Sequence, residues 1–179
     1  MIRELNDIND LDAVIRQFLI RQSQLEPRFV RNSKSVFGSD LDKSDDNVVF
    51  KSINQDDVTI LFSVYDRRSD SDMTETNSDG SIAVYKSFVI HVIVYGNKSG
   101  MMANKLVARF RTLKVRSDLQ ENAIHLETIS DITELQDFKA STIWERNDFD
   151  INISCRLAFD QVDDDYDIES LTSLIIDEA

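Results

Sequence analysis

The stretch TIWERNDFDINISCRLAF, residues 142–159, decides the fold. From Asp148 onward, apolar side chains occupy every second position: Phe149, Ile151, Ile153, Cys155, Leu157 and Phe159. Polar side chains fill the positions between them: Asp148, Asp150, Asn152, Ser154 and Arg156. A period of two over this length is typical of a strand that buries one face. The sequence therefore predicts a long, half-buried strand over Asp148–Phe159.

Two other segments have the periodicity of helices. Apolar residues recur at helical spacing from about Asp7 to Arg21: Ile8, Leu11, Val14, Ile15, Phe18 and Leu19. A second apolar stripe runs through Met101–Leu113: Met102, Leu106, Phe110 and Leu113. Each stripe predicts a helix that buries one side, and we expect the second stripe to lie on a sheet.

Strands are predicted at four further places. They are Val48–Ile53, Val58–Tyr65, Ala83–Tyr95 and Ala123–Ile129. The segment Ala83–Tyr95 is apolar on both faces near its end, which favours a central place in the sheet. Asn54–Asp57 has the composition of a turn, and Asp131–Phe138 predicts a short turn or helix.

Three polar segments separate or follow these elements. Residues 31–47 predict a loop, and Asp66–Ser81 has almost no large apolar residue. The second segment is therefore either disordered or a long exposed arm between two strands. After Asp160 the chain is acidic and then ends in a short apolar segment, which docks on its own domain or on a neighbour.

The order of elements defines the fold class. Helix, three strands, helix and two strands predict an α+β fold, with a mixed, mostly antiparallel sheet and two helices packed on one face. A chain of 179 residues with 41% hydrophobic residues fits a single domain. We expect this domain to span residues 1–160 and residues 161–179 to form an acidic C-terminal arm.

Composition excludes several classes of protein. No apolar run approaches the roughly 18 residues of a membrane-spanning helix. The charged start of the chain lacks the apolar region of a signal peptide, so we expect that the protein is not secreted. The formal net charge of -13 argues against tight, general DNA binding. Acidity also suits a channel through which DNA slides without sticking.

No set of residues forms a recognisable catalytic or metal site. The two histidines, His91 and His125, have no cysteine or carboxylate at ligand spacing along the chain. Cys155 lies on the apolar face of its strand, where a small buried side chain is expected rather than a reactive thiol. We therefore predict no enzyme activity, no metal and no cofactor.

One segment is basic in an otherwise acidic chain. No acid interrupts the stretch from residue 98 to residue 116, which contains Lys98, Lys105, Arg109, Arg111, Lys114 and Arg116. Three interpretations stay open: a solvated helix face with local ion pairs, a surface that meets an acidic face of a neighbouring copy, and a DNA contact. The second suits a ring, because head-to-tail rings join two different patches.

Several short motifs, in a fixed order, resemble one family. Trp144-Glu145-Arg146 is followed by Asp148-Phe149-Asp150. Upstream, a long strand ends in Tyr95-Gly96-Asn97, and a helix leads to Asp131-Ile132-Thr133-Glu134-Leu135. Over residues 84–159 this order resembles the phage neck or tail terminator proteins, whereas residues 31–80 and the acidic tail depart from it.

The resemblance implies a structural protein of the virion, assembled in the host cytoplasm. The expected assembly is a ring, commonly of six copies, that terminates the tail tube and joins it to the head connector. The partners would be copies of the chain, the tail tube protein and connector or adaptor proteins, with no membrane. Genomic DNA would pass through the lumen without specific binding. The alternatives are another head-completion or connector ring protein, and an intracellular enzyme or regulator without a recognisable motif.

Overall fold

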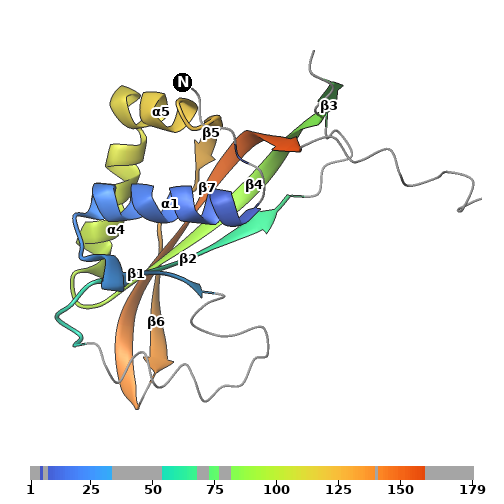
Figure 1. Cartoon of the computed structure of the whole chain (residues 1–179). Helices are drawn as coiled ribbons and strands as arrows, with labels where there is room; N and C mark the ends of the chain where they lie inside the picture. The colour runs from blue at the N-terminus through green and yellow to red at the C-terminus, as the bar shows by residue number, and fades with distance from the viewer. Residues whose placement is uncertain are drawn as a thin grey trace, which may run out of the picture.

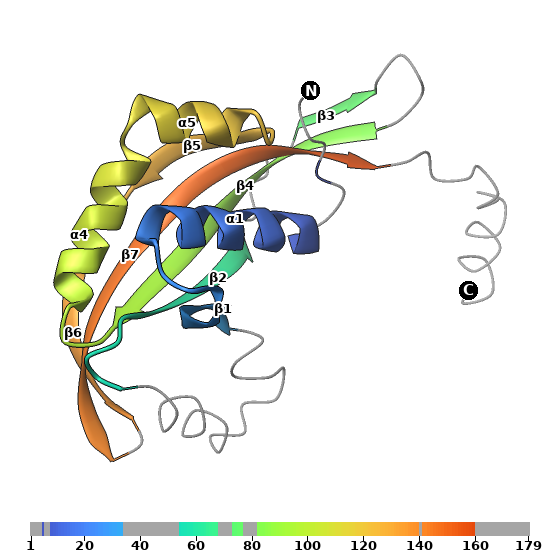
Figure 2. The same cartoon turned by 60° about the vertical axis from the view of Figure 1, so that its left-hand side comes forward.

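The fold is a curved sheet with a layer of helices on one face (Figures 1 and 2). The computed structural model describes Leu5 and residues 8–33, 54–67, 73–76, 82–139 and 141–159. The elements, in chain order, are α1 (Ile8–Ser23), the 3-10 helix η1 (Pro27–Phe29), β1 (Val30–Asn32), β2 (Thr59–Asp66), β3 (Met73–Thr76), β4 (Ile82–Tyr95), α4 (Ser99–Phe110), α5 (Leu113–Gln120), β5 (Ile124–Ile129), β6 (Thr133–Lys139) and β7 (Thr142–Phe159).

Two long strands form the centre of the sheet. The strand order is β1-β2-β4-β7-β5, while β3 also pairs with β4 and β6 also pairs with β7. Every residue of β4 has a partner in β7, from Ile82 opposite Phe159 to Tyr95 opposite Arg146. Among the described strands, all pairings are antiparallel except that of β1 with β2, and an isolated parallel bridge joins Leu5 to Leu157. The predicted central position of Ala83–Tyr95 is confirmed.

The strand at the end of the described chain is longer than its alternating part. β7 begins at Thr142 and has 18 residues, of which the first part pairs with β6 and the second with β5. Its predicted apolar face is buried at Phe149, Ile151, Ile153, Cys155 and Leu157. The prediction of a half-buried strand is thus confirmed, and its true start lies six residues earlier than the alternation (residue 142 rather than 148).

The core lies between this face of the sheet and the helices. α1 contacts β1, β2 and α4, whereas α4 contacts β4 and β7 and α5 contacts β5. The apolar side of α1 is buried as its spacing predicts: Leu11, Val14, Ile15, Phe18 and Leu19. The predicted fold class, an α+β fold with a mixed and mostly antiparallel sheet, is confirmed.

The helical layer differs from the prediction at its far end. Met102, Leu106 and Phe110 are buried, but Leu113 is 86% exposed. α4 stops at Phe110, and Thr112 caps a new helix by accepting a hydrogen bond from the backbone of Val115. The chain turns there, so Leu113 leaves the stripe, and α5 is a third helix that the spacing did not predict.

The prediction for Asp131–Phe138 is wrong. The structure forms strand β6 there, and it pairs with the start of β7 from Thr133 opposite Asp148 to Lys139 opposite Thr142. In Figures 1 and 2 this β6–β7 hairpin extends beyond the helical layer, at the end of the molecule opposite α5.

Other predictions concern segments that the structure describes only in part. Within 66–81, strand β3 forms a hairpin with β4 in which Thr76 lies opposite Ile82. This supports an arm between two strands, because part of the segment is ordered against β4. The turn at Asn54–Asp57 is present, with a backbone hydrogen bond from Asp57 to Asn54. The strand at 48–53, most of the loop at 31–47 and the tail at 160–179 lie outside the described residues.

Candidate interaction surfaces

The basic segment divides into two groups of side chains. Lys105 and Arg109 are half-buried and contact the last turn of α1. Lys105 Nζ lies 3.2 Å from the backbone oxygen of Ser23, and Arg109 donates to the backbone oxygen of Gln22. The carbonyl groups at a helix end lack partners within the helix, so cations are favourable there. These two residues therefore join α1 to α4 within the protomer.

The other basic side chains are exposed. Within the part of the chain that the structure describes, they make no ion pair and no side-chain hydrogen bond: Lys98, Arg111, Lys114 and Arg116. Lys98 precedes α4, at the end of the molecule near the hairpin. The remaining three, which we name the basic ridge, follow one another across the junction of α4 and α5.

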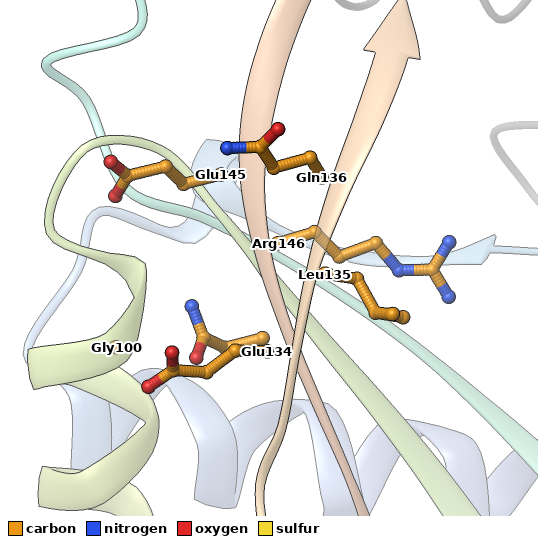
Figure 3. Close-up of a pocket in the computed structure, with 7 residues that line it drawn as sticks. Gly100, Glu134, Leu135, Gln136, Glu145 and Arg146 are labelled. Atoms are coloured by element: carbon orange, nitrogen blue, oxygen red, sulfur yellow. The ribbon is translucent and has the colours of Figure 1, made fainter.

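A pocket lies at the opposite end, between the β6–β7 hairpin and the start of α4 (Figure 3). Its volume is about 440 Å³, and it is lined by Gly100, Glu134, Leu135, Gln136, Glu145, Arg146 and Asn147. Cross-strand pairing brings the polar residues together, since Glu134 lies opposite Asn147 and Gln136 lies opposite Glu145. Figure 3 shows Glu134, Gln136 and Glu145 on one side of the hairpin, whereas Arg146 points to the other.

The pocket is acidic and contains a buried acceptor without a donor. Glu134 and Glu145 are exposed and have no ion pair within the described residues. Asn147 is only 5% exposed. Its Nδ2 donates to Ser99 Oγ at 2.8 Å, but its Oδ1 accepts no hydrogen bond in the described structure. A buried polar atom without a partner is costly to stability, so a donor that reaches this oxygen would stabilise the protein.

Two large apolar side chains continue the same side of the hairpin. Phe138 lies directly opposite Ile143, and the two are 69% and 61% exposed. Residues two apart in a strand share a face, so this pair follows Gln136 and Glu145 toward the hairpin tip. Contiguous exposed apolar surface can mark a contact site, and this pair is the apolar part of the surface beside the pocket.

The other face of the hairpin carries a network that is satisfied within the protomer. The Arg146 guanidinium is bidentate on Asp148, with Nε 2.8 Å from Oδ1, and lies 3.4 Å from Asp137. Tyr95 donates to Asp137 at 2.9 Å. Burial raises the pKa of the Tyr95 hydroxyl above its ordinary value, and the hydrogen bond with Asp148 raises the pKa of Arg146. This network fixes the hairpin to the end of β4.

The residues considered for chemistry are placed without a catalytic arrangement. His91 Nδ1 lies 2.7 Å from Asp150 Oδ1, and Nε2 lies 3.7 Å from Asp148 Oδ2. The two carboxylates thus face opposite edges of the ring and do not converge on one point. The spacing of these residues along the chain did not reveal this contact, which arises from the pairing of β4 with β7.

The other two candidates do not add a site. His125 is exposed, and Cys155 is buried, which raises the pKa of its thiol to about 12. Among the described residues, no group of three or more His, Cys, Asp or Glu side chains is arranged to hold a metal ion. None of the helices described is both long enough and apolar enough to span a membrane.

The described residues form an α+β protein whose exposed features are a basic ridge, an acidic pocket and an apolar pair. The chain belongs to the phage neck terminator protein family, whose model matches residues 9–178. The match includes residues 31–80 and nearly all of the acidic tail, so it extends well beyond the 84–159 of the sequence resemblance. A comparison with curated proteins gives no significant match. Membership gives the chain a structural role in the phage neck or tail, as part of the virion.

Proposed function

We propose that the chain forms a ring at the head–tail junction, commonly of six copies, that terminates the tail tube and joins it to the head connector. Family membership over residues 9–178 is the observation that carries the proposal. The family implies self-assembly and contact with other tail or head proteins. The ring acts by binding: one of its surfaces contacts the tube and another contacts the connector.

The surfaces of the protomer support assembly. Within the described part of the chain, the helices lie on one face of the sheet, and the β6–β7 hairpin carries exposed Phe138 and Ile143 beyond the helical layer. The net charge of -13 suits a lumen that lets DNA pass without specific binding. We propose the exposed basic residues for a subunit interface: Lys98, Arg111, Lys114 and Arg116.

The experiment is to add the purified full chain to tail tube protein while the tube polymerises. Electron microscopy should show rings of the chain alone and rings at one end of each tube, with growth stopped at that end. A separate sample with connector protein should show the same ring joined to it. Tubes that keep growing, with no ring at their ends, would refute the terminator function. Rings that bind only the connector would favour another head-completion protein.

A further inference from the structure

The geometry points to a specific contact between neighbouring copies: the acidic pocket of one protomer receives a cationic side chain from the basic ridge of the next. The pocket is formed by Glu134, Gln136, Glu145 and Asn147 beside the start of α4. The ridge residues that enter are Lys114 and Arg116 on α5. This inference rests on the proposed ring, and it names the two surfaces that would close it.

The pocket has the charge and the hydrogen-bonding capacity for such a side chain. Two glutamates carry negative charges, and the helix start beside them offsets only about half an elementary charge. Arg146 also lines the pocket, but its guanidinium is bidentate on Asp148. Asn147 Oδ1 is buried and lacks a donor within the described residues. An ammonium or guanidinium group supplies only donors, so its chemistry complements the pocket carboxylates and this acceptor.

The surface around the pocket suits the rest of a long cationic side chain. Phe138 and Ile143 are exposed on the same side of the hairpin as Glu145. Lys and Arg cover apolar surface with their aliphatic stems while the charged group reaches a polar site. The pocket thus accepts the charge, and the apolar pair packs against the stem or against the helix that carries it.

The two surfaces cannot meet within one protomer. α5 lies at one end of the molecule and the β6–β7 hairpin at the other in both views (Figures 1 and 2). Opposite charges at opposite ends define a head-to-tail contact, in which one patch meets a different patch on the next copy. Such contacts generate a closed ring when the rotation between copies permits it.

A metal ion fits the pocket less well than a cationic side chain. The pocket lining includes two carboxylates, and the described residues contain no group of three or more metal-binding side chains. Calcium takes six to eight oxygen ligands at short distance. A neighbour's cationic side chain requires no such cage, and the exposed ridge residues have no counter-ion of their own within the described chain.

Charge exchange between the two surfaces tests the pairing. One variant carries Glu134→Lys and Glu145→Lys, and the other carries Lys114→Glu and Arg116→Glu. Each alone places like charges in the contact and should raise the concentration for half-maximal assembly by roughly tenfold or more. An equal mixture should assemble again, because each reversed surface meets an opposite charge on the other variant. Circular dichroism checks that both variants fold.

A matched control separates the pocket from general charge effects. Glu127→Lys reverses one exposed glutamate on β5, away from the hairpin, and should assemble like the wild type. Glu145→Lys alone, with the same change in charge, should not. Assembly of the pocket variant at wild-type concentrations would overturn the inference, as would a mixture that fails to recover. Assembly that depends on calcium and is lost on chelation would overturn it too.

Cross-linking distinguishes a wrong contact from a wrong function. A chain with Glu145→Cys, mixed with a chain with Lys114→Cys, should form a disulfide dimer, while Glu127→Cys with Lys114→Cys should not. Buried Cys155 does not compete. A dimer without rings or tube binding would retain the contact and refute the terminator function. Rings without this dimer would retain the function and refute the contact.

Discussion

Lys105 on α4 reaches the end of α1, where its Nζ lies 3.2 Å from the backbone oxygen of Ser23. Arg109, one turn later, donates to the backbone oxygen of Gln22. The two cations therefore stabilise the junction of two helices inside one protomer. A charge reversal at these positions therefore affects the stability of the protomer itself, and not an interface between protomers.

Replacing Lys105 and Arg109 together by Glu should lower the free energy of unfolding by about 2 kcal/mol, because charged hydrogen bonds at a helix end are lost and like charges face the end of α1. Urea unfolding, followed by the fluorescence of the single buried Trp144, measures the change. The matched double variant Lys114→Glu and Arg116→Glu should stay within about 0.5 kcal/mol of the wild type. Equal losses in both would contradict the helix-anchoring role.

Gly96 should tolerate no side chain. Its φ is +115°, and a Cβ there would lie 2.5 Å from the backbone oxygen of Asp57. Gly96→Ala should cost about 2 kcal/mol or more, since both the backbone conformation and the close contact are strained. Gly100 is the control, because its Cβ would meet nothing nearer than 3.6 Å in the first turn of α4. Thermal unfolding should show a large loss for the first variant and none for the second.

Leu106 and Leu113 should respond very differently to the same truncation. Leu106 is a fully buried residue of α4, whereas Leu113 is 86% exposed at the start of α5. Leu106→Ala should cost about 2–5 kcal/mol through lost burial and a cavity, while Leu113→Ala should cost less than about 0.5 kcal/mol. Denaturant midpoints at constant slope are the measurement. A large loss at Leu113 would mean that the helix continues past Phe110.

Cys155 should be inert in the folded protein. Burial raises the pKa of its thiol from about 9 to about 12, so the thiol stays neutral at pH 8 and cannot be reached. A coloured disulfide reagent should react with it only as fast as the protein unfolds, and fully in denaturant. Rapid reaction of the native chain at pH 8 would contradict this placement.

The same shift predicts how stability depends on pH. In the unfolded chain the Cys155 thiol ionises above about pH 9, while in the folded chain it remains protonated until about pH 12. The contribution of the Cys155 thiol to the free energy of unfolding is therefore complete below about pH 9. It is lost as the pH rises toward 12, at up to about 1.4 kcal/mol per pH unit. Cys155→Ala should flatten the curve of unfolding free energy over this window. Parallel curves for wild type and variant would refute the assignment.

Strong periodicity predicted the main elements of the fold. Phe149 to Leu157 alternate because every second side chain enters the core, and the stripe of α1 repeats with the helical turn. The segment Asp131–Phe138 has its large apolar residues three apart, at Ile132, Leu135 and Phe138, and that spacing fits a helix. In β6 the same spacing places Leu135 and Phe138 on opposite faces, both exposed. Pairing with β7 makes this segment a strand.

Contacts across the sheet could not be predicted from spacing along the chain. Glu134 and Glu145 share a pocket only because the β6–β7 register places Glu134 opposite Asn147 and Gln136 opposite Glu145. The basic segment was visible in the sequence, but the division of its side chains depends on where α1 ends. The signal for the pocket lies in the alternation of Glu134, Gln136 and Phe138, once that segment is recognised as a strand.

The continuity of β7 has a mechanical consequence. One strand of 18 residues, about 60 Å long at the usual rise, runs without a break from the tip of the hairpin into the centre of the sheet. A pull along its axis loads its hydrogen bonds with β4 in shear, from Tyr95 opposite Arg146 to Ile82 opposite Phe159. These bonds share the force and yield together instead of opening one after another. Force applied to the hairpin along β7 is therefore transmitted to the central strands of the protomer.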